Sequence, residues 1–309
     1  MASALGVLTV PVIYALTFLL GIGFALGLPA MLALIPALAP KGMLSQAVSL
    51  NAAGINVARL AGPAIGGFLF DVAGPTWCFG INAFSFLALI AALMVVRPRD
   101  AGHRPERVGM RVALQFAWVD PGIRRLLLGM AIFTTCAAPV QELAPVVADL
   151  LGAGPRGLGL LLGAMGGGAL VGAWLLERMT TRGLARGSAL PLATTLVAVG
   201  MLALSVAPNL PLALAAMGFC GAFWIWLFSA TNTAVQLRSP GGMVGRMLGL
   251  YQLAVIGPIA IGSVAAGALA DVVGIRISLA ICASLLALWG GWSLTHRVCE
   301  IDGGRATFP

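Results

Sequence analysis

Apolar segments recur along this chain at a length that suits a bilayer crossing. Runs of about 20 apolar residues, enough to span a hydrocarbon core, occur nine times and are separated by short turns rich in Gly, Pro or charge. No stretch alternates apolar and polar residues with a period of two, so strands are not indicated. The pattern predicts an all-α polytopic membrane protein with helices over 9–38, 45–70, 75–96, 123–149, 156–177, 187–207, 210–236, 244–270 and 274–295.

The two ends of the chain resemble each other at an offset of 200 residues. Residues 11–97 align with 211–297 without a gap, and the matched pairs include Pro11 and Pro211, Pro40 and Pro240, Asp71 and Asp271, and Arg97 and Arg297. Such matches in one register indicate a duplicated unit. Parallel repeats of this kind are typical of transporters whose two halves enclose a central site. We therefore expect 9–96 and 209–296 to superpose as three-helix units.

Composition agrees with a membrane location. Hydrophobic residues make up 60% of the chain and charged residues 9%, whereas soluble domains carry about 25% charge. The net charge of +8 suggests nucleic-acid binding, but the positions of the basic residues favour a different explanation. Most of them fall in alternate loops and in the C-terminal tail, and only Arg156 and Arg276 lie on the opposite side. This is the positive-inside pattern. We expect a multi-pass inner (plasma) membrane protein with a cytoplasmic C-terminus, whose partner is the lipid bilayer and not nucleic acid.

Charge and repeat together divide the chain into four parts. Residues 1–96 form a partial N-terminal half of three helices plus a stub, 97–122 a cytoplasmic loop between the halves, 123–296 a six-helix C-terminal half, and 297–309 a cytoplasmic tail. The copy of 98–208 would lie before Met1, and nine spans place the N-terminus outside without a signal peptide. We therefore expect the sequence to be truncated at its N-terminus, with Met1–Leu8 as the remnant of a third helix.

Cysteine and histidine offer little chemistry. The five cysteines stand singly and mostly within apolar spans, and the two histidines, His103 and His296, lie beside arginines. Neither set has the spacing of metal ligands, so the cysteines are interpreted as small core residues. We expect no metal or cofactor, and this composition argues against an intramembrane protease or metalloenzyme.

Several motifs resemble the major facilitator superfamily. The paired halves, the long basic loop at 97–122 and the arginines after the fifth span are similar to that superfamily, with the spans matching helices four to twelve of a twelve-helix fold. The stretch 56–67, which includes Gly62, Pro63, Gly66 and Gly67, resembles the G-P-x-x-G-G signature of drug:proton antiporters. Together with Asn82 and its neighbours, it resembles the branch of siderophore (enterobactin-type) and macrolide exporters.

A second motif resembles the basic gating loop of the same superfamily. It follows the second helix of the C-terminal half, has Glu in place of the usual Asp, and comprises Glu177, Arg178, Arg182 and Arg186. The resemblance implies export of a hydrophobic or amphipathic small molecule by alternating access, by a monomer that uses the proton gradient as its driving force. An acidic coupling residue of such exporters belongs to the first helix, which has no counterpart in this chain.

Few polar side chains interrupt the apolar spans. Arg59 is the one basic residue in the middle of a span, where a charge costs roughly 2.5–3.5 kcal/mol on insertion scales, and Asn56 lies three residues before it on the same helix face. These two residues are predicted to line a cavity. The alternative is a structural arginine that binds carbonyl groups or an acid.

Glu142 is the one carboxylate well inside a span, next to Gln141, and it is a candidate proton carrier. The alternative is an exposed carboxylate in an outer vestibule. Further polar groups suited to an apolar ligand are Asn232, Gln236, Tyr251 and Gln252. Two other functions stay open from the sequence: a non-transporting remnant of an exporter, and, with less support, an integral membrane enzyme.

Overall fold

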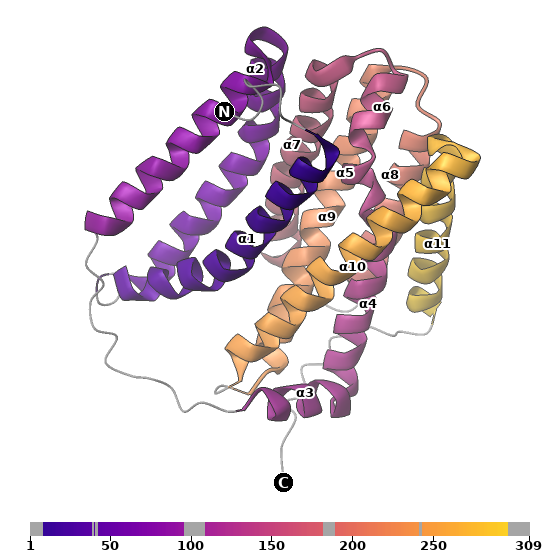
Figure 1. Ribbon diagram of the computed structural model, residues 1–309. Coiled ribbons are helices and arrows are strands. Elements are labelled where there is room, and N and C mark those ends of the chain that lie inside the picture. Colours follow the sequence, from indigo (N-terminus) through magenta and orange to yellow (C-terminus); the bar gives the residue numbers. More distant parts are fainter. Residues whose placement is uncertain are drawn as a thin grey trace. The chain divides into compact units, whose positions relative to one another are not determined.

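The computed structural model describes residues 9–38, 40, 43–95, 109–181, 189–240 and 243–295. Within these ranges the regular elements are all helices (Figure 1), which confirms the predicted all-α fold. They are α1 (Val10–Leu38), α2 (Leu44–Val95), α3 (Met110–Val119), α4 (Pro121–Ala137), α5 (Pro139–Glu142), α6 (Ala144–Leu150), α7 (Gly154–Thr181), α8 (Ala189–Ser205), α9 (Leu210–Arg238), α10 (Val244–Val273) and α11 (Ile275–Thr295).

The helices follow the nine predicted spans. Helix α2 holds two of them, joined at Gly74, and α4, α5 and α6 together occupy the span predicted as 123–149. Among the described residues, six segments are long and apolar enough to cross a membrane: Val72–Val95, Pro121–Leu150, Gly154–Leu175, Leu210–Arg238, Val244–Val273 and Ile275–Leu294. Shorter apolar segments lie at Tyr14–Gly23 and Leu190–Ser205. The chain is a multi-pass membrane protein.

The 200-residue repeat reappears in the helix bounds. Helix α1 begins and ends 200 residues before α9, and α2 begins 200 residues before α10. Gly74 has φ of 80° and ψ of 174°, and Gly274 has φ of 85° and ψ of 155°. These positive φ values lie where only glycine fits without strain, so both copies bend at an equivalent glycine. Superposition of the two three-helix units stays a prediction.

The structure divides into two compact units, Met1–Arg104 and Pro105–Pro309. The first contains α1 and α2, and the second contains α3 to α11. In the second unit, α9 packs between α7 and α8, α8 packs against α11, and α10 packs against α4. Its core is formed by buried apolar side chains such as Phe133, Met217, Met247 and Leu286.

The region predicted as a loop between the halves contains a helix. Helix α3 occupies ten residues of the predicted loop 97–122. It buries Ala113, Phe116 and Ala117, while Met110 and Trp118 are exposed. This helix was not predicted, because its apolar run is too short for a membrane crossing.

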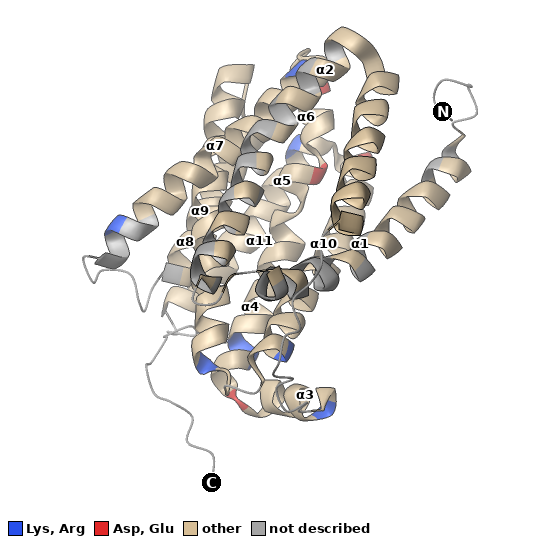
Figure 2. Ribbon diagram, turned by 90° about the vertical axis from the view of Figure 1, so that its left-hand side faces the viewer, with Lys and Arg blue, Asp and Glu red and all other residues tan. Residues whose placement is uncertain are grey.

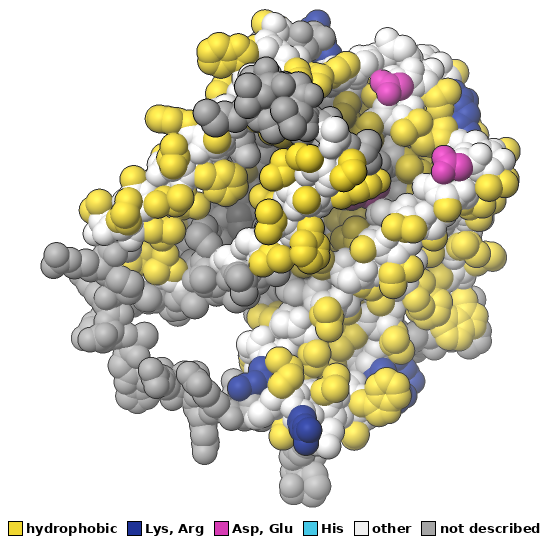
Figure 3. Space-filling view, in the orientation of Figure 1, with side chains coloured by type: hydrophobic (Ala, Val, Ile, Leu, Met, Phe, Trp, Pro, Cys, Tyr) yellow, Lys and Arg dark blue, Asp and Glu magenta, His cyan; other side chains and the backbone are white. Residues whose placement is uncertain are grey.

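The described arginines of the second unit lie at its two ends. The chain crosses this unit in alternating directions through α4 to α6, α7, α8, α9, α10 and α11. Arg124, Arg178 and Arg238 therefore share one end, while Arg156 and Arg276 share the other. Figure 2 shows basic residues around α3 and the start of α4. Figure 3 shows apolar side chains, interspersed with other residues and backbone, over the visible part of this unit between these ends. This distribution matches a bundle whose middle is surrounded by lipid.

Glycines bring α7 and α9 into backbone contact. A Cβ atom on Gly168 would lie 1.8 Å from the carbonyl oxygen of Gly218, and one on Gly221 would lie 1.9 Å from that of Met165. Because these neighbours are backbone atoms, no side-chain rotation can make room for a methyl group. In lipid, such close approach through small residues is a main source of helix association.

We predict that Gly168→Ala destabilises the protein by about 1–3 kcal/mol, the usual cost of overpacking a well-packed contact. Gly249→Ala is the matched control, since Gly249 also lies inside a helix but a Cβ there meets no atom within 4 Å. Thermal unfolding in detergent distinguishes them. A melting temperature of Gly168→Ala equal to that of Gly249→Ala would show that the α7–α9 contact is not this tight.

Candidate functional site

The span predicted as one helix over 123–149 is broken twice. Helix α4 ends at Ala137, α5 covers only Pro139–Glu142, and α6 begins at Ala144. Prolines cause both breaks, because Pro139 and Pro145 have no N–H to donate to the preceding turn. The predicted span over 123–149 is confirmed as the apolar segment Pro121–Leu150, and its helix is interrupted at these two points.

The first break lies at a close helix crossing. The carbonyl of Thr135 has no helical donor, because the residue four positions later is Pro139. That carbonyl oxygen would lie 2.0 Å from a Cβ atom on Gly262 of α10. The backbone of α10 therefore covers the freed carbonyl, and glycine is the residue that permits this approach.

Gln141 and Glu142 lie between the two breaks, and both side chains are exposed. Irregular backbone at membrane depth is tolerated where it is buried in protein or lines a water-filled cavity. An exposed carboxylate at such a position fits a water-filled vestibule. Whether Glu142 is a proton carrier or a vestibule carboxylate, the two interpretations left open by the sequence, stays a prediction.

An aromatic cluster joins α4 and α9. The ring of Phe133 lies edge-on to Trp224 at 5.0 Å between centroids, and Trp224 stacks on Phe228 at 5.8 Å. Phe133 is 1% exposed, while Trp224 and Phe228 are half-buried. The cluster offers flat apolar surface. The four-residue spacing of Trp224 and Phe228 places both rings on one helix face, and this spacing is the signal in the sequence that could have predicted the cluster.

The predicted polar residues of α9 and α10 have mixed environments. Tyr251 is 1% exposed, and its hydroxyl donates to the carbonyl of Phe228 at 3.3 Å, so it is a packed core group. Gln252 is half-buried. The Nε2 of Gln236 donates to Oδ1 of Asn232 at 2.5 Å, which pairs these two amides along one face of α9.

These candidates do not form one cluster. Asp120 and Arg238 form an ion pair and so mark one common depth in the bundle. Glu142 lies 22 residues after Asp120, whereas Asn232 lies six residues before Arg238. At 1.5 Å per helical residue, roughly 20 Å of membrane depth separates Glu142 from the amide pair. Tyr251 and the aromatic cluster lie between them.

Candidates in the first unit are described only in part. Arg59 and Asn56 lie within α2, but their side chains are outside the described residues, as are those of Pro63 and Gly67. Asn82 is exposed, and its carbonyl accepts from the hydroxyl of Ser85 at 2.7 Å. Gly62 and Gly66 are exposed, and a Cβ on either meets no described atom within 4 Å. The predicted cavity role of these residues stays a prediction.

The predicted gating loop lies mostly outside the described residues. Arg182 and Arg186 are not described, and Glu177 is described only in its backbone. The Arg178 guanidinium lies 3.9 Å above the ring centroid of Trp174 at the end of α7, a cation–π contact.

An ion pair that was not predicted from the sequence lies at the basic end of the second unit. Oδ1 of Asp120 accepts from the amide of Ile123 at 2.8 Å, which caps α4, and it lies 3.6 Å from Nε of Arg238 at the end of α9. A Cβ on Gly122 would collide with the Arg238 guanidinium. The side chain of Asp120 is 8% exposed. The sequence signal was Asp-Pro-Gly at a helix start, a typical capping pattern.

No group of three His, Cys, Asp or Glu side chains able to hold a metal ion occurs among the described residues.

An all-α bundle with apolar crossing segments and arginines at its ends defines a multi-pass membrane protein. The sequence matches the transmembrane secretion effector family over residues 1–306. The chain therefore belongs to this family of the major facilitator superfamily, as the motifs around Gly62 and Glu177 predicted.

Curated relatives carry transport names. The chain is similar to the multidrug efflux pump Tap of Mycolicibacterium fortuitum, with 26% identity over 268 residues, 84% of this chain and 65% of that protein. It is similar to the enterobactin exporter EntS of Salmonella typhi, with 29% identity over 266 residues, and of Escherichia coli O1:K1, with 31% over 267, each covering 82% of this chain and 62% of the relative. The chain thus spans less than two thirds of the length of these relatives.

We predict that Asp120→Ala lowers the free energy of unfolding by about 2–4 kcal/mol, because it removes a helix cap and leaves Arg238 without its carboxylate. Asp120→Asn keeps the cap and removes only the charge, so it should cost less. Arg246→Gln, at the same end of the bundle, is the control. Unfolding in detergent of the wild type, Asp120→Ala, Arg238→Gln and the double variant gives the coupling energy, and a value near zero would mean that the pair contributes nothing.

Proposed function

We propose that this protein exports a hydrophobic or amphipathic small molecule across the inner (plasma) membrane by alternating access, in exchange for protons. The observation that carries the proposal is the exposed carboxylate of Glu142 between two proline breaks, in a chain of an efflux family. Relatives named as a multidrug pump and an enterobactin exporter support export as the direction. The proposed partners are lipid and substrate, and the protein acts as a monomer without a cofactor.

The orientation follows from charge. Arg124, Arg238 and Arg246 share the end of the bundle that holds α3, and the positive-inside rule makes that end cytoplasmic. Helix α11 ends on the same side, which supports the proposed cytoplasmic C-terminus. Glu142 then lies near the outer face, where its carboxylate exchanges protons with the outer solution.

The aromatic cluster gives the proposed pathway its affinity for apolar groups. Trp224 and Phe228 are half-buried between the depth of Glu142 and that of the Asn232–Gln236 pair. Sparse hydrogen-bonding groups beside flat apolar surface suit a mostly apolar ligand with a few polar atoms. No catalytic constellation is part of this proposal, and the protein moves its substrate unchanged.

We predict that Glu142→Gln flattens the pH dependence of efflux, because an amide cannot exchange protons. The assay follows a fluorescent lipophilic dye in everted membrane vesicles with an imposed pH gradient. Asp149→Asn is the matched control, since Asp149 is an exposed acid at the end of α6 near the same face. If Glu142→Gln keeps the wild-type pH profile, the carboxylate is not the proton carrier.

We also predict that Arg59→Leu reduces efflux to the level of empty vesicles while the protein still reaches the membrane. A guanidinium at mid-membrane must face water, an acid or an anionic part of the substrate. Arg59→Lys keeps the charge and should keep part of the activity. Wild-type efflux by Arg59→Leu would make this arginine a structural residue and remove it from the proposed pathway.

A further inference from the structure

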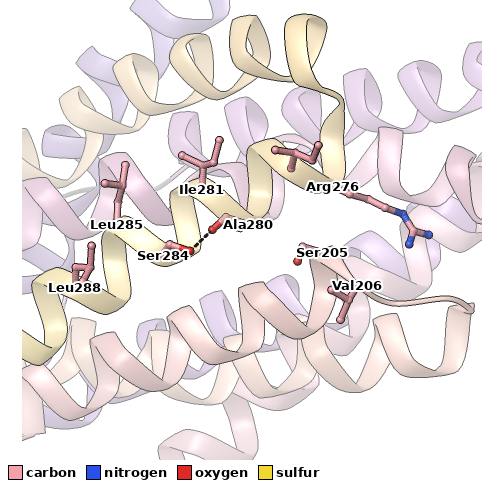
Figure 4. A pocket seen from close by; sticks show the side chains of 9 residues that line it. Ser205, Val206, Arg276, Ala280, Ile281, Ser284, Leu285 and Leu288 are labelled. Atoms are coloured by element: carbon pink, nitrogen blue, oxygen red, sulfur yellow. Dashed lines mark hydrogen bonds between the residues drawn. The ribbon is translucent and has the colours of Figure 1, made fainter.

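A groove runs along the seam between α8 and α11 of the second unit, as Figure 4 shows. Its volume is about 520 Å³, and its walls include Val206, Ile281, Leu285 and Leu288. A second hollow of about 650 Å³ shares Leu288 with it and continues along α11. Most of the lining is apolar.

The two serines of the groove present no free donor to it. The Ser205 hydroxyl donates to the carbonyl of Leu202 at 2.7 Å, and the Ser284 hydroxyl donates to that of Ala280 at 2.7 Å. Both groups are used within their own helices. The charged side chain of the lining, Arg276, lies at the end of the groove where α8 ends and α11 begins (Figure 4).

Arg276 is held in place but not neutralised. Its Nη2 donates to the carbonyl of Ala207 at 3.1 Å, which uses one of five guanidinium donors. Among the described residues, no carboxylate lies within ion-pair distance of this guanidinium. The remaining donors are free to bind a planar or tetrahedral anion.

The position of Arg276 in its helix also favours an anion. It lies in the first turn of α11, which has no acidic residue. The N-terminus of a helix carries partial positive charge, so a cation there is unfavourable unless an anion compensates it. An anion at Arg276 would therefore relieve repulsion that the protein alone leaves in place.

We propose that this groove binds an anionic phospholipid of the surrounding leaflet, with its phosphate on Arg276 and one acyl chain along Ile281, Leu285 and Leu288. The rise from Arg276 to Leu288 is about 18 Å at 1.5 Å per residue. One leaflet of the hydrocarbon core is about 15 Å thick. A single acyl chain therefore covers the apolar length of the groove while its phosphate stays at the interface.

Native mass spectrometry of the full chain in detergent tests this site. Phosphatidylglycerol and phosphatidylcholine with the same acyl chains are the probes. We expect phosphatidylglycerol to bind more tightly, and Arg276→Gln to weaken it about tenfold or more, the effect of losing a charge-assisted hydrogen bond. The affinity of Arg276→Lys for phosphatidylglycerol should lie between those of the wild type and of Arg276→Gln. Arg156→Gln, which removes the other described arginine at that end, should bind as the wild type does.

Two further measurements separate the groove from general surface charge. Ser284→Phe fills the groove without changing charge, and it should weaken phosphatidylglycerol binding. Excess inorganic phosphate should not displace the lipid. Equal binding of the two lipids, equal losses in Arg276→Gln and Arg156→Gln, or displacement by phosphate would overturn the proposal. Circular dichroism of each variant, matched to wild type, establishes that the bundle is folded.

Discussion

The contact between α7 and α9 at Gly168 and Gly218 is the interaction on which the second unit depends. In lipid, burying apolar side chains gives little driving force for association, since the tails are as apolar as leucine. Close backbone packing supplies dispersion contacts instead. This contact fixes α9, and α9 in turn positions Trp224, the Asn232–Gln236 pair and Arg238, which reaches the start of α4.

A second constraint shapes the site. The bilayer requires every backbone polar group to be satisfied inside the protein, yet Pro139 removes a donor from the middle of a crossing. The freed carbonyl of Thr135 is covered by the backbone at Gly262, while Glu142, three residues after the proline, is exposed. Helix breaks cost stability, and such sites in transporters lie where substrates or ions bind.

Apolar length predicted the nine spans to within a few residues, and the 200-residue repeat seen in the sequence reappears in the structure as equivalent bends at Gly74 and Gly274. Apolar length could not reveal the breaks after Ala137, because prolines in a membrane span keep the hydropathy high. Apolar length also gives no sign of the pairing of Asp120 with Arg238. These residues are 118 positions apart, and their contact depends on how α4 and α9 pack. The site was less predictable than the fold: Tyr251, expected to line a cavity, is buried and bonded to a carbonyl.

The central claim is that this bundle couples proton movement to export. The most direct measurement uses purified chain in liposomes with a pH-sensitive dye inside and a lipophilic aromatic substrate added outside. The account predicts that substrate addition changes the internal pH in proportion to the amount of protein, and that an uncoupler abolishes the change. Substrate movement by folded protein without any proton movement would contradict it.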